Sequence, residues 1–79
     1  MYTPDEKTVK QIQNNFKYHS PLPNQPERYT RIRSAAGEFA MLLACNCPPS
    51  RELSLALTNL EDSVMWANAA IARNERGDA

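Results

Sequence analysis

The spacing of apolar residues between positions 53 and 71 constrains this chain's fold more than any other feature. The intervals alternate between four and three residues, through Leu53, Leu57, Leu60, Val64, Ala67 and Ile71. Such a repeat places all six side chains on one stripe of a helix, and it is typical of the seam between two antiparallel helices. Ser50 is a favourable N-cap residue just before the repeat. The pattern therefore predicts a long helix over about residues 51–74 that packs against a second helix.

Prolines mark where the other helices end. Three prolines lie between residues 21 and 26, and two follow Cys47, so neither segment can continue a helix. Between them, Asn24 is a candidate N-cap with Glu27 three residues later, which predicts a helix over about 25–46. Its apolar residues recur at helical spacing: Ile32, Ala35, Ala36, Phe39, Leu42 and Leu43. The short connection between the two long helices predicts an αα-hairpin.

The N-terminal segment carries its own helix signals. Thr3, Pro4 and Glu6 form a capping-box pattern that predicts a helix over about residues 4–16. Its thin apolar stripe is expected to pack inward, through Val9, Ile12 and Phe16. Residues 17–24 form a proline-rich loop and residues 75–79 a tail. We expect a single all-α domain over residues 1–79, a short N-terminal helix followed by a long antiparallel αα-hairpin.

The third helix is more apolar than one hairpin requires. Outside its seam it still carries Ala56, Met65, Trp66, Ala69, Ala70 and Ala72. A chain of 79 residues buries only about 60% of its unfolded surface, so partner subunits would help to stabilise it. We expect a homo-oligomer rather than a monomer with an exposed apolar patch. The predicted interface consists of Met65, Trp66, Asn68, Ala69 and Ala72.

Composition excludes several classes of function. Nine basic and nine acidic residues balance to zero charge, which argues against a binder of polymeric nucleic acid, although residues 1–33 hold six basic and three acidic groups. Cys45 and Cys47, with one histidine in the chain, are too few for a zinc site. We expect no metal and no cofactor, and both cysteines as reduced, buried small side chains. No signal peptide or membrane span is predicted, which suggests a cytosolic protein.

The sequence contains no recognisable catalytic constellation or phosphate-binding glycine loop, so we expect a binding protein and not an enzyme. Phe16, Tyr18 and His19 lie at the end of the first helix, and Arg28, Arg31 and Arg33 lie on the first turns of the second. Aromatic rings stack on nucleobases and arginine forks bind phosphates. The combination suits a small phosphorylated nucleotide. The alternative is that the aromatic rings only fasten the loop to the hairpin.

Three segments of the chain resemble a known family. They are YHSP (18–21), ERYTRIRSAAGEFAMLL (27–43) and CPPSRELSLALTNLEDSVMWANAAIARNE (47–75). Together they are similar to the hairpin domain of phage anti-CBASS cyclic-oligonucleotide sponges, a domain shared with Thoeris anti-defence sponges. The resemblance covers roughly residues 14–75.

The resemblance implies a non-enzymatic protein of the host bacterial cytoplasm that sequesters cyclic nucleotide immune messengers. It also implies a homohexamer built as a trimer of dimers. Cyclic dinucleotides such as 3′,3′-cyclic GMP–AMP would bind between protomers. Cyclic trinucleotides such as cyclic tri-AMP would bind on the threefold axis.

Residue by residue, the resemblance implies two sets of ligand contacts. Tyr18, His19, Pro21 and Arg33 would form the cyclic-dinucleotide site, with Arg33 at a position where the family can have lysine. Ser34 and Arg73 would form the cyclic-trinucleotide site, although the family's hydroxyl could also correspond to position 35, which is alanine here. Two other functions fit the sequence: a Thoeris-type sponge for cyclic ADP-ribose isomers, and a helical hairpin that blocks a host protein. An oligomeric phage assembly factor is a third.

Overall fold

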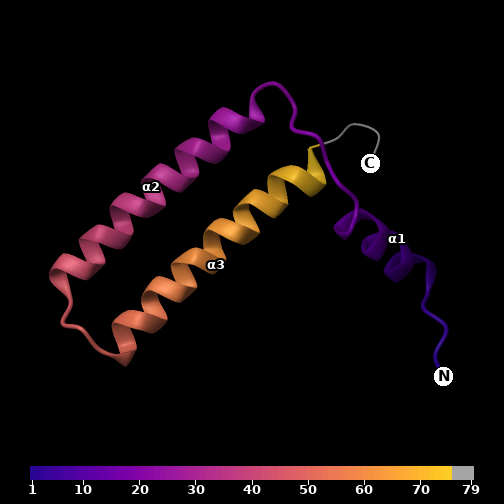
Figure 1. Ribbon diagram of the computed structural model, residues 1–79. Helices are drawn as coiled ribbons and strands as arrows, with labels where there is room; N and C mark the ends of the chain where they lie inside the picture. Colours follow the sequence, from indigo (N-terminus) through magenta and orange to yellow (C-terminus); the bar gives the residue numbers. More distant parts are fainter. Residues whose placement is uncertain (76–79) are drawn as a thin grey trace.

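The computed structural model describes residues 1–75, which form three α-helices and no strand. Helix α1 spans Glu6–Asn15, α2 spans Gln25–Asn46 and α3 spans Arg51–Asn74. Helices α2 and α3 run antiparallel beside each other, and α1 points away from the end of the hairpin where α3 finishes (Figure 1). The predicted all-α fold, with a short N-terminal helix and an αα-hairpin, is confirmed. Of the predicted tail, residues 76–79 lie outside the described part of the chain.

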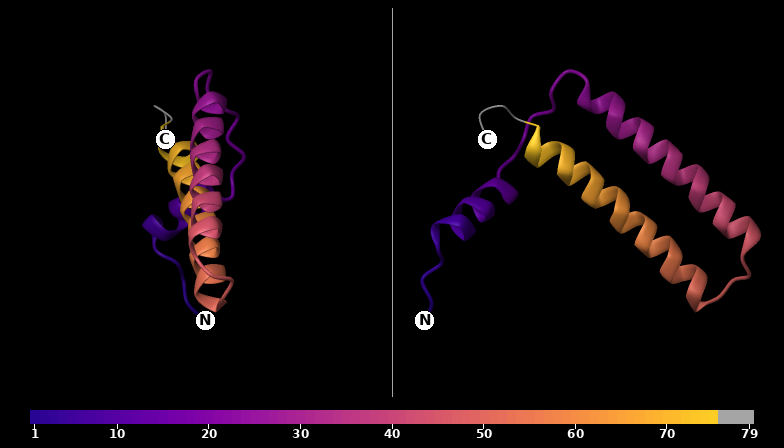
Figure 2. Two further views of the ribbon diagram at one scale, coloured as in Figure 1. Left: turned by 90° about the vertical axis from the view of Figure 1, so that its left-hand side faces the viewer. Right: turned by 180° about the vertical axis from the view of Figure 1, so that it is seen from behind.

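The hairpin is a single layer of two helices. The described chain measures 48 × 40 × 13 Å, and its smallest dimension is close to the diameter of one helix (Figure 2). Within residues 1–75, Ile71 is the only apolar residue that is buried, with 8% of its surface exposed. One chain therefore has a seam between two helices in place of a conventional core.

The seam follows the predicted repeat. All six residues of the four-three pattern in α3 are buried or half-buried. The apolar residues of α2 divide into two stripes. Ile32, Ala36 and Leu43 are half-buried against α3, whereas Phe39 and Leu42 stay 49% and 56% exposed. The second stripe has no partner within the described chain, because the hairpin covers only one side of each helix.

The N-caps of the helices match those predicted from the sequence only in part. Ser50 caps α3 as predicted, because its side chain accepts a hydrogen bond of 3.1 Å from the backbone N–H of Leu53. Helix α1 is capped by Asp5, which accepts from the Thr8 N–H at 2.8 Å, so the predicted capping role of Thr3 is wrong. The helix begins at Glu6, and only the residue immediately before it can reach the N–H groups of the first turn.

Helix α2 begins differently from the capping box expected there. Asn24 occupies the cap position, but its backbone is helical (φ −95°, ψ −2°) and its side chain makes no cap hydrogen bond. A capping side chain normally needs the extended backbone that Asn24 lacks. The side chain of Gln25 stabilises the turn that leads into α2 instead. Its fully buried side chain accepts a 2.9 Å hydrogen bond from the Leu22 N–H, so a buried polar group holds the end of the loop.

Two further expectations are wrong for the single chain. The stripe of α1 does not pack inward: Ile12 is 48% exposed and Phe16 is 86% exposed, because α1 diverges from the hairpin. A hydrogen bond of 3.3 Å from the Asn14 side chain to the Arg73 carbonyl connects α1 to α3. Cys45 is exposed and Cys47 is half-buried, so the expectation that both cysteines are buried is wrong.

A polar cluster closes the open end of the hairpin. The guanidinium of Arg28 donates two hydrogen bonds of 2.7 Å to the two carboxylate oxygens of Glu75. The amide of Gln25 donates a third, at 3.2 Å. The bonds from Arg28, and then that from Gln25, hold the pKa of the Glu75 carboxyl below its ordinary value, and the carboxylate raises the pKa of Arg28. The cluster joins residues that are about fifty positions apart in the sequence.

The Glu75→Gln variant is expected to be less stable than the wild type at neutral pH, and the difference is expected to shrink in acid. Folding lowers the pKa of Glu75. Its stabilising effect is therefore complete above the unfolded-chain value of about 4.3 and is lost as the pH falls through the lower folded-state pKa. Urea unfolding of both proteins across this range measures the difference. The matched control is Glu6→Gln, whose exposed ion pair with Lys10 contributes little at any pH. A constant difference between Glu75→Gln and the wild type at all pH values would contradict the prediction.

Candidate functional site

A hollow of about 480 Å³ lies where α1, the proline-rich loop and the open end of the hairpin meet. We call it the ligand hollow. It is lined by Asn15, Lys17, Tyr18, His19, Tyr29, Arg33, Asn68, Ala69, Ala72 and Arg73. The end of α1, the loop, the first turns of α2 and the last turns of α3 all contribute to it. No single element of the sequence could form it alone.

Hydrogen bonds across three elements hold the loop side of the hollow. Prolines keep residues 21–26 out of a regular helix until α2 begins, so Tyr18 and His19 precede a stiff crossing from α1 to α2. The Nε2 atom of His19 donates to the carbonyl of Asn14 at 3.0 Å, and the Asn14 side chain donates to the carbonyl of Arg73. The ends of α1 and α3 and the loop are thereby connected around one space.

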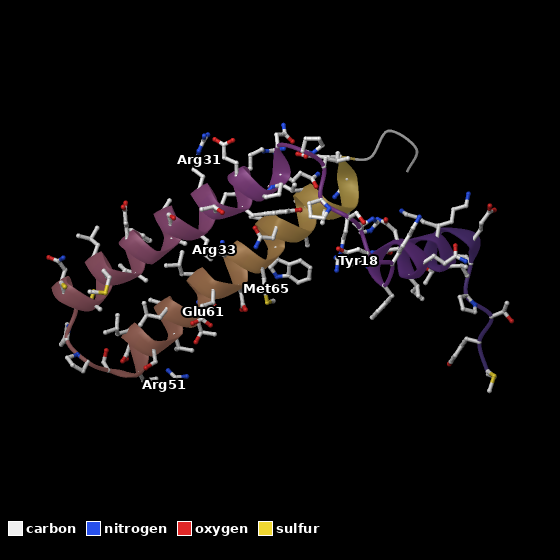
Figure 3. All side chains as sticks on the ribbon, turned by 45° about the horizontal axis from the view of Figure 1, so that its top comes forward. Tyr18, Arg31, Arg33, Arg51, Glu61 and Met65 are labelled. Carbon is white, nitrogen blue, oxygen red and sulfur yellow. The ribbon has the colours of Figure 1, made fainter. Side chains whose placement is uncertain are left out.

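The ligand hollow combines an exposed aromatic ring with unpaired cations. Tyr18 is 80% exposed and lies at the junction of α1 with the hairpin, whereas Arg33 comes from α2 (Figure 3). Within residues 1–75, the guanidinium groups of Arg33 and Arg73 form no ion pair, in contrast to those of Arg28 and Arg31. The ring can stack on a flat base and the free guanidinium groups can bind an anion. The arrangement suits a small anionic ligand with planar rings.

The structure gathers residues from both predicted ligand sites into this one hollow. Tyr18, His19 and Arg33 of the dinucleotide set line it together with Arg73 of the trinucleotide set. Pro21 and Ser34 are exposed and lie outside its lining. Their predicted ligand contacts stay predictions, as do those of the other four residues.

Three residues of the lining are not among the predicted site and interface residues: Asn15, Lys17 and Tyr29. Tyr29 lies one helical turn before Arg33, so its position on the same face of α2 could have been read from the spacing. Asn15 had no such signal, because its place depends on how the end of α1 meets α3.

A second hollow, of about 500 Å³, lies between α1 and the end of α3. Its lining is Gln11, Asn14, Asn15, Phe16, Trp66, Arg73 and Asn74. Arg73 belongs to both hollows, so its side chain lies on the boundary between them. Trp66, predicted to be an interface residue, is 65% exposed here in the single chain.

An apolar groove of about 420 Å³ runs between α2 and α3. It is lined by Arg33, Ala36, Gly37, Ala40, Leu57, Leu60, Glu61, Val64, Met65 and Asn68. Met65 is 61% exposed, and the space where a side chain of Gly37 would begin is open. Of the predicted interface residues, Met65 and Asn68 line this groove, while Asn68, Ala69 and Ala72 line the ligand hollow. The groove could accept an apolar helix.

Neither a metal site nor a membrane span is found among the described residues. No group of three or more histidine, cysteine, aspartate or glutamate side chains in residues 1–75 could hold a metal ion. In the same part of the chain, no helix is long and apolar enough to cross a bilayer.

Comparison with known proteins gives one match. The family model described as the Acb2/Tad1 hairpin domain matches residues 8–72. The match includes most of α1, all of α2 and α3 as far as Ala72. No curated protein and no solved structure matches the chain.

Proposed function

Because the chain belongs to the Acb2/Tad1 hairpin-domain family, we propose that it is a phage anti-defence protein that sequesters cyclic oligonucleotide immune messengers without cleaving them. Members of this family are anti-defence sponges. The observation that supports the ligand class is the lining of the ligand hollow, which combines Tyr18 with Arg33 and Arg73, whose guanidinium groups form no ion pair within residues 1–75. The proposed place of action is the cytoplasm of the host bacterium, where such messengers are made.

The chemistry of the hollow suits a cyclic dinucleotide. Such a ligand carries two phosphate charges and two flat bases. A tyrosine ring stacked on a base contributes about 1–3 kcal/mol, and an arginine fork binds a phosphate in two places. Because the whole protein has no net charge, its attraction for a cyclic dinucleotide depends on the local grouping of Lys17 and Arg33.

The active form is proposed to be a homohexamer. The hairpin is one helix thick, and Phe39, Met65 and Trp66 are exposed on it. Soluble proteins seldom leave so much apolar surface uncovered. Two chains about a twofold axis would place two Tyr18 rings and two Arg33 forks around a ligand of matching symmetry. Three chains would likewise supply three Arg73 side chains to a cyclic trinucleotide, and Ser34 would reach a ligand only in such an assembly.

Titration calorimetry with 3′,3′-cyclic GMP–AMP and with cyclic tri-AMP, together with the mass of the protein in solution, tests the proposal. We expect saturation at one dinucleotide for each two chains and one trinucleotide for each three. The ligand recovered after denaturation of the protein should be chemically unchanged, which separates a sponge from an enzyme. A folded protein that gives no heat with either ligand would contradict the proposal for these messengers.

A second candidate ligand follows from the family itself. The matched family joins Acb2 with Tad1, so the hairpin domain is shared by sponges of both the anti-CBASS and the Thoeris branches. Cyclic ADP-ribose isomers also carry phosphates and a purine, and they fit the same grouping of ring and cations. The same titration with these isomers decides between the two branches.

A further inference from the structure

Two buried polar atoms of residues that line the ligand hollow have no hydrogen-bond partner within residues 1–75. They are Nδ1 of His19 and Oδ1 of Asn68. Both residues belong to the lining of the hollow, one from the loop and one from α3. Buried polar atoms in folded proteins nearly always have a partner, so each unpaired one requires an explanation.

Both atoms are hydrogen-bond acceptors. The Nε2 atom of His19 faces the Asn14 carbonyl at 3.0 Å, and a carbonyl oxygen only accepts, so Nε2 carries the hydrogen. In a neutral imidazole the other nitrogen, Nδ1, is then an acceptor. The Oδ1 atom of Asn68 is also an acceptor. The lining of the hollow therefore contains two buried acceptors without a partner in residues 1–75, and a ligand group that satisfies them must supply donors.

The space beside Asn68 suits a flat ring. Ala69 and Ala72, which also line the hollow from α3, have side chains of a single methyl group. The Tyr18 ring can bind a base face and the guanidinium group of Arg33 can bind a phosphate. Stacking on the base face and binding of the phosphate leave the hydrogen-bonding edge of the base without a partner. The amine of a purine supplies donors at that edge.

We propose that Asn68 and His19 recognise an exocyclic amine on a nucleobase of the ligand, so that the hollow selects amine-bearing purines. This assignment rests on the proposed function, because it concerns the same hollow. It gives Asn68, predicted from the sequence to be an interface residue, a direct contact with ligand. Cyclic dinucleotides that lack the amine would leave the two acceptors unsatisfied and bind more weakly.

Cyclic di-GMP, cyclic di-AMP and cyclic di-IMP form a suitable set of probes. They share the cyclic phosphate ring and the charge, and hypoxanthine carries no exocyclic amine. Titration calorimetry of the full-length protein is expected to show the better of the two amine-bearing ligands binding at least about fivefold more tightly than cyclic di-IMP. In Asn68→Leu, which keeps the side-chain size and removes the acceptor, that ratio should fall below about twofold.

Control variants separate recognition from folding and assembly. Asn59→Leu changes an exposed asparagine of α3 that lies outside the two hollows and the apolar groove, and it should keep the wild-type ratio of affinities. Asn68→Asp retains an acceptor and should keep the preference for the amine, even where its charge weakens all three ligands. Each variant's mass in solution and thermal unfolding are measured alongside.

The outcomes distinguish this inference from the function on which it rests. If the wild type binds none of the three ligands, the proposed dinucleotide function fails and the inference fails with it. If cyclic di-IMP binds as tightly as the other two, or if Asn68→Leu keeps the wild-type ratio, the sponge function stands and the inference is wrong. A change in mass for Asn68→Leu with an unchanged ligand ratio would assign Asn68 to contacts between copies instead.

Discussion

Replacing Tyr18 with alanine is expected to weaken the binding of a cyclic dinucleotide by at least about 30-fold. Each stacked base contributes about 1–3 kcal/mol, and the proposed pocket between two protomers would contain two Tyr18 rings, so the expected loss is at least about 2 kcal/mol. The ring is 80% exposed in the single chain, so its removal should cost the fold little. Titration calorimetry with 3′,3′-cyclic GMP–AMP measures the change, and circular dichroism checks that the helices remain.

Two variants control for this result. Tyr18→Phe keeps the aromatic face and should retain most of the affinity. Tyr2→Ala removes a tyrosine ring that is 97% exposed and lies before α1 and outside the ligand hollow, and it should bind like the wild type. If Tyr18→Ala retained wild-type affinity, the alternative reading of the aromatic residues, as a fastening of the loop to the hairpin, would be favoured.

Replacing Arg73 with alanine is expected to weaken the binding of cyclic tri-AMP by at least about 1,000-fold. Three copies of Arg73 about a threefold axis would each make a charge-assisted contact worth about 1.5–3 kcal/mol. The variant should fold normally, because the Arg73 guanidinium has no ion pair within residues 1–75. The atom that joins α3 to α1 is the backbone carbonyl of residue 73, which alanine keeps. Cyclic dinucleotide binding should change by less than about threefold if the two sites are separate.

Arg51→Ala is the matched control for Arg73→Ala. Arg51 is an exposed arginine at the opposite end of α3, away from the ligand hollow (Figure 3). Its loss changes the net charge equally and should leave both ligands bound. Tyr18 and Arg73 line one hollow in the single chain, so the two substitutions also test whether that hollow is a single site for both ligands. If each substitution weakened both ligands to the same extent, one hollow would serve both and the assignment of two sites would be wrong.

The sequence by itself determined the helices and the seam. Leu53 to Ile71 repeat with the period of a helix, the prolines after Cys47 end α2, and Ser50 caps α3. Each of these effects acts between residues at most four positions apart, so the order of residues is enough to reveal it. The exceptions within this range were the starts of α1 and α2. Thr3 and Asp5 are both good caps for α1, and the competition between them is not visible in the pattern. Asn24 precedes α2 but its side chain makes no cap hydrogen bond.

The tertiary structure alone decided how the ends of the three helices meet. The bonds of Gln25 and Arg28 to Glu75, and that of Asn14 to the Arg73 carbonyl, join residues that lie 47 to 59 positions apart. No local pattern contains such pairs, because their geometry depends on the lengths and crossing of complete helices. At the same end of the molecule His19 and Asn68 line one hollow, and α1 points away from the hairpin. The chemistry of the site was therefore present in the residues, but their convergence required the folded chain.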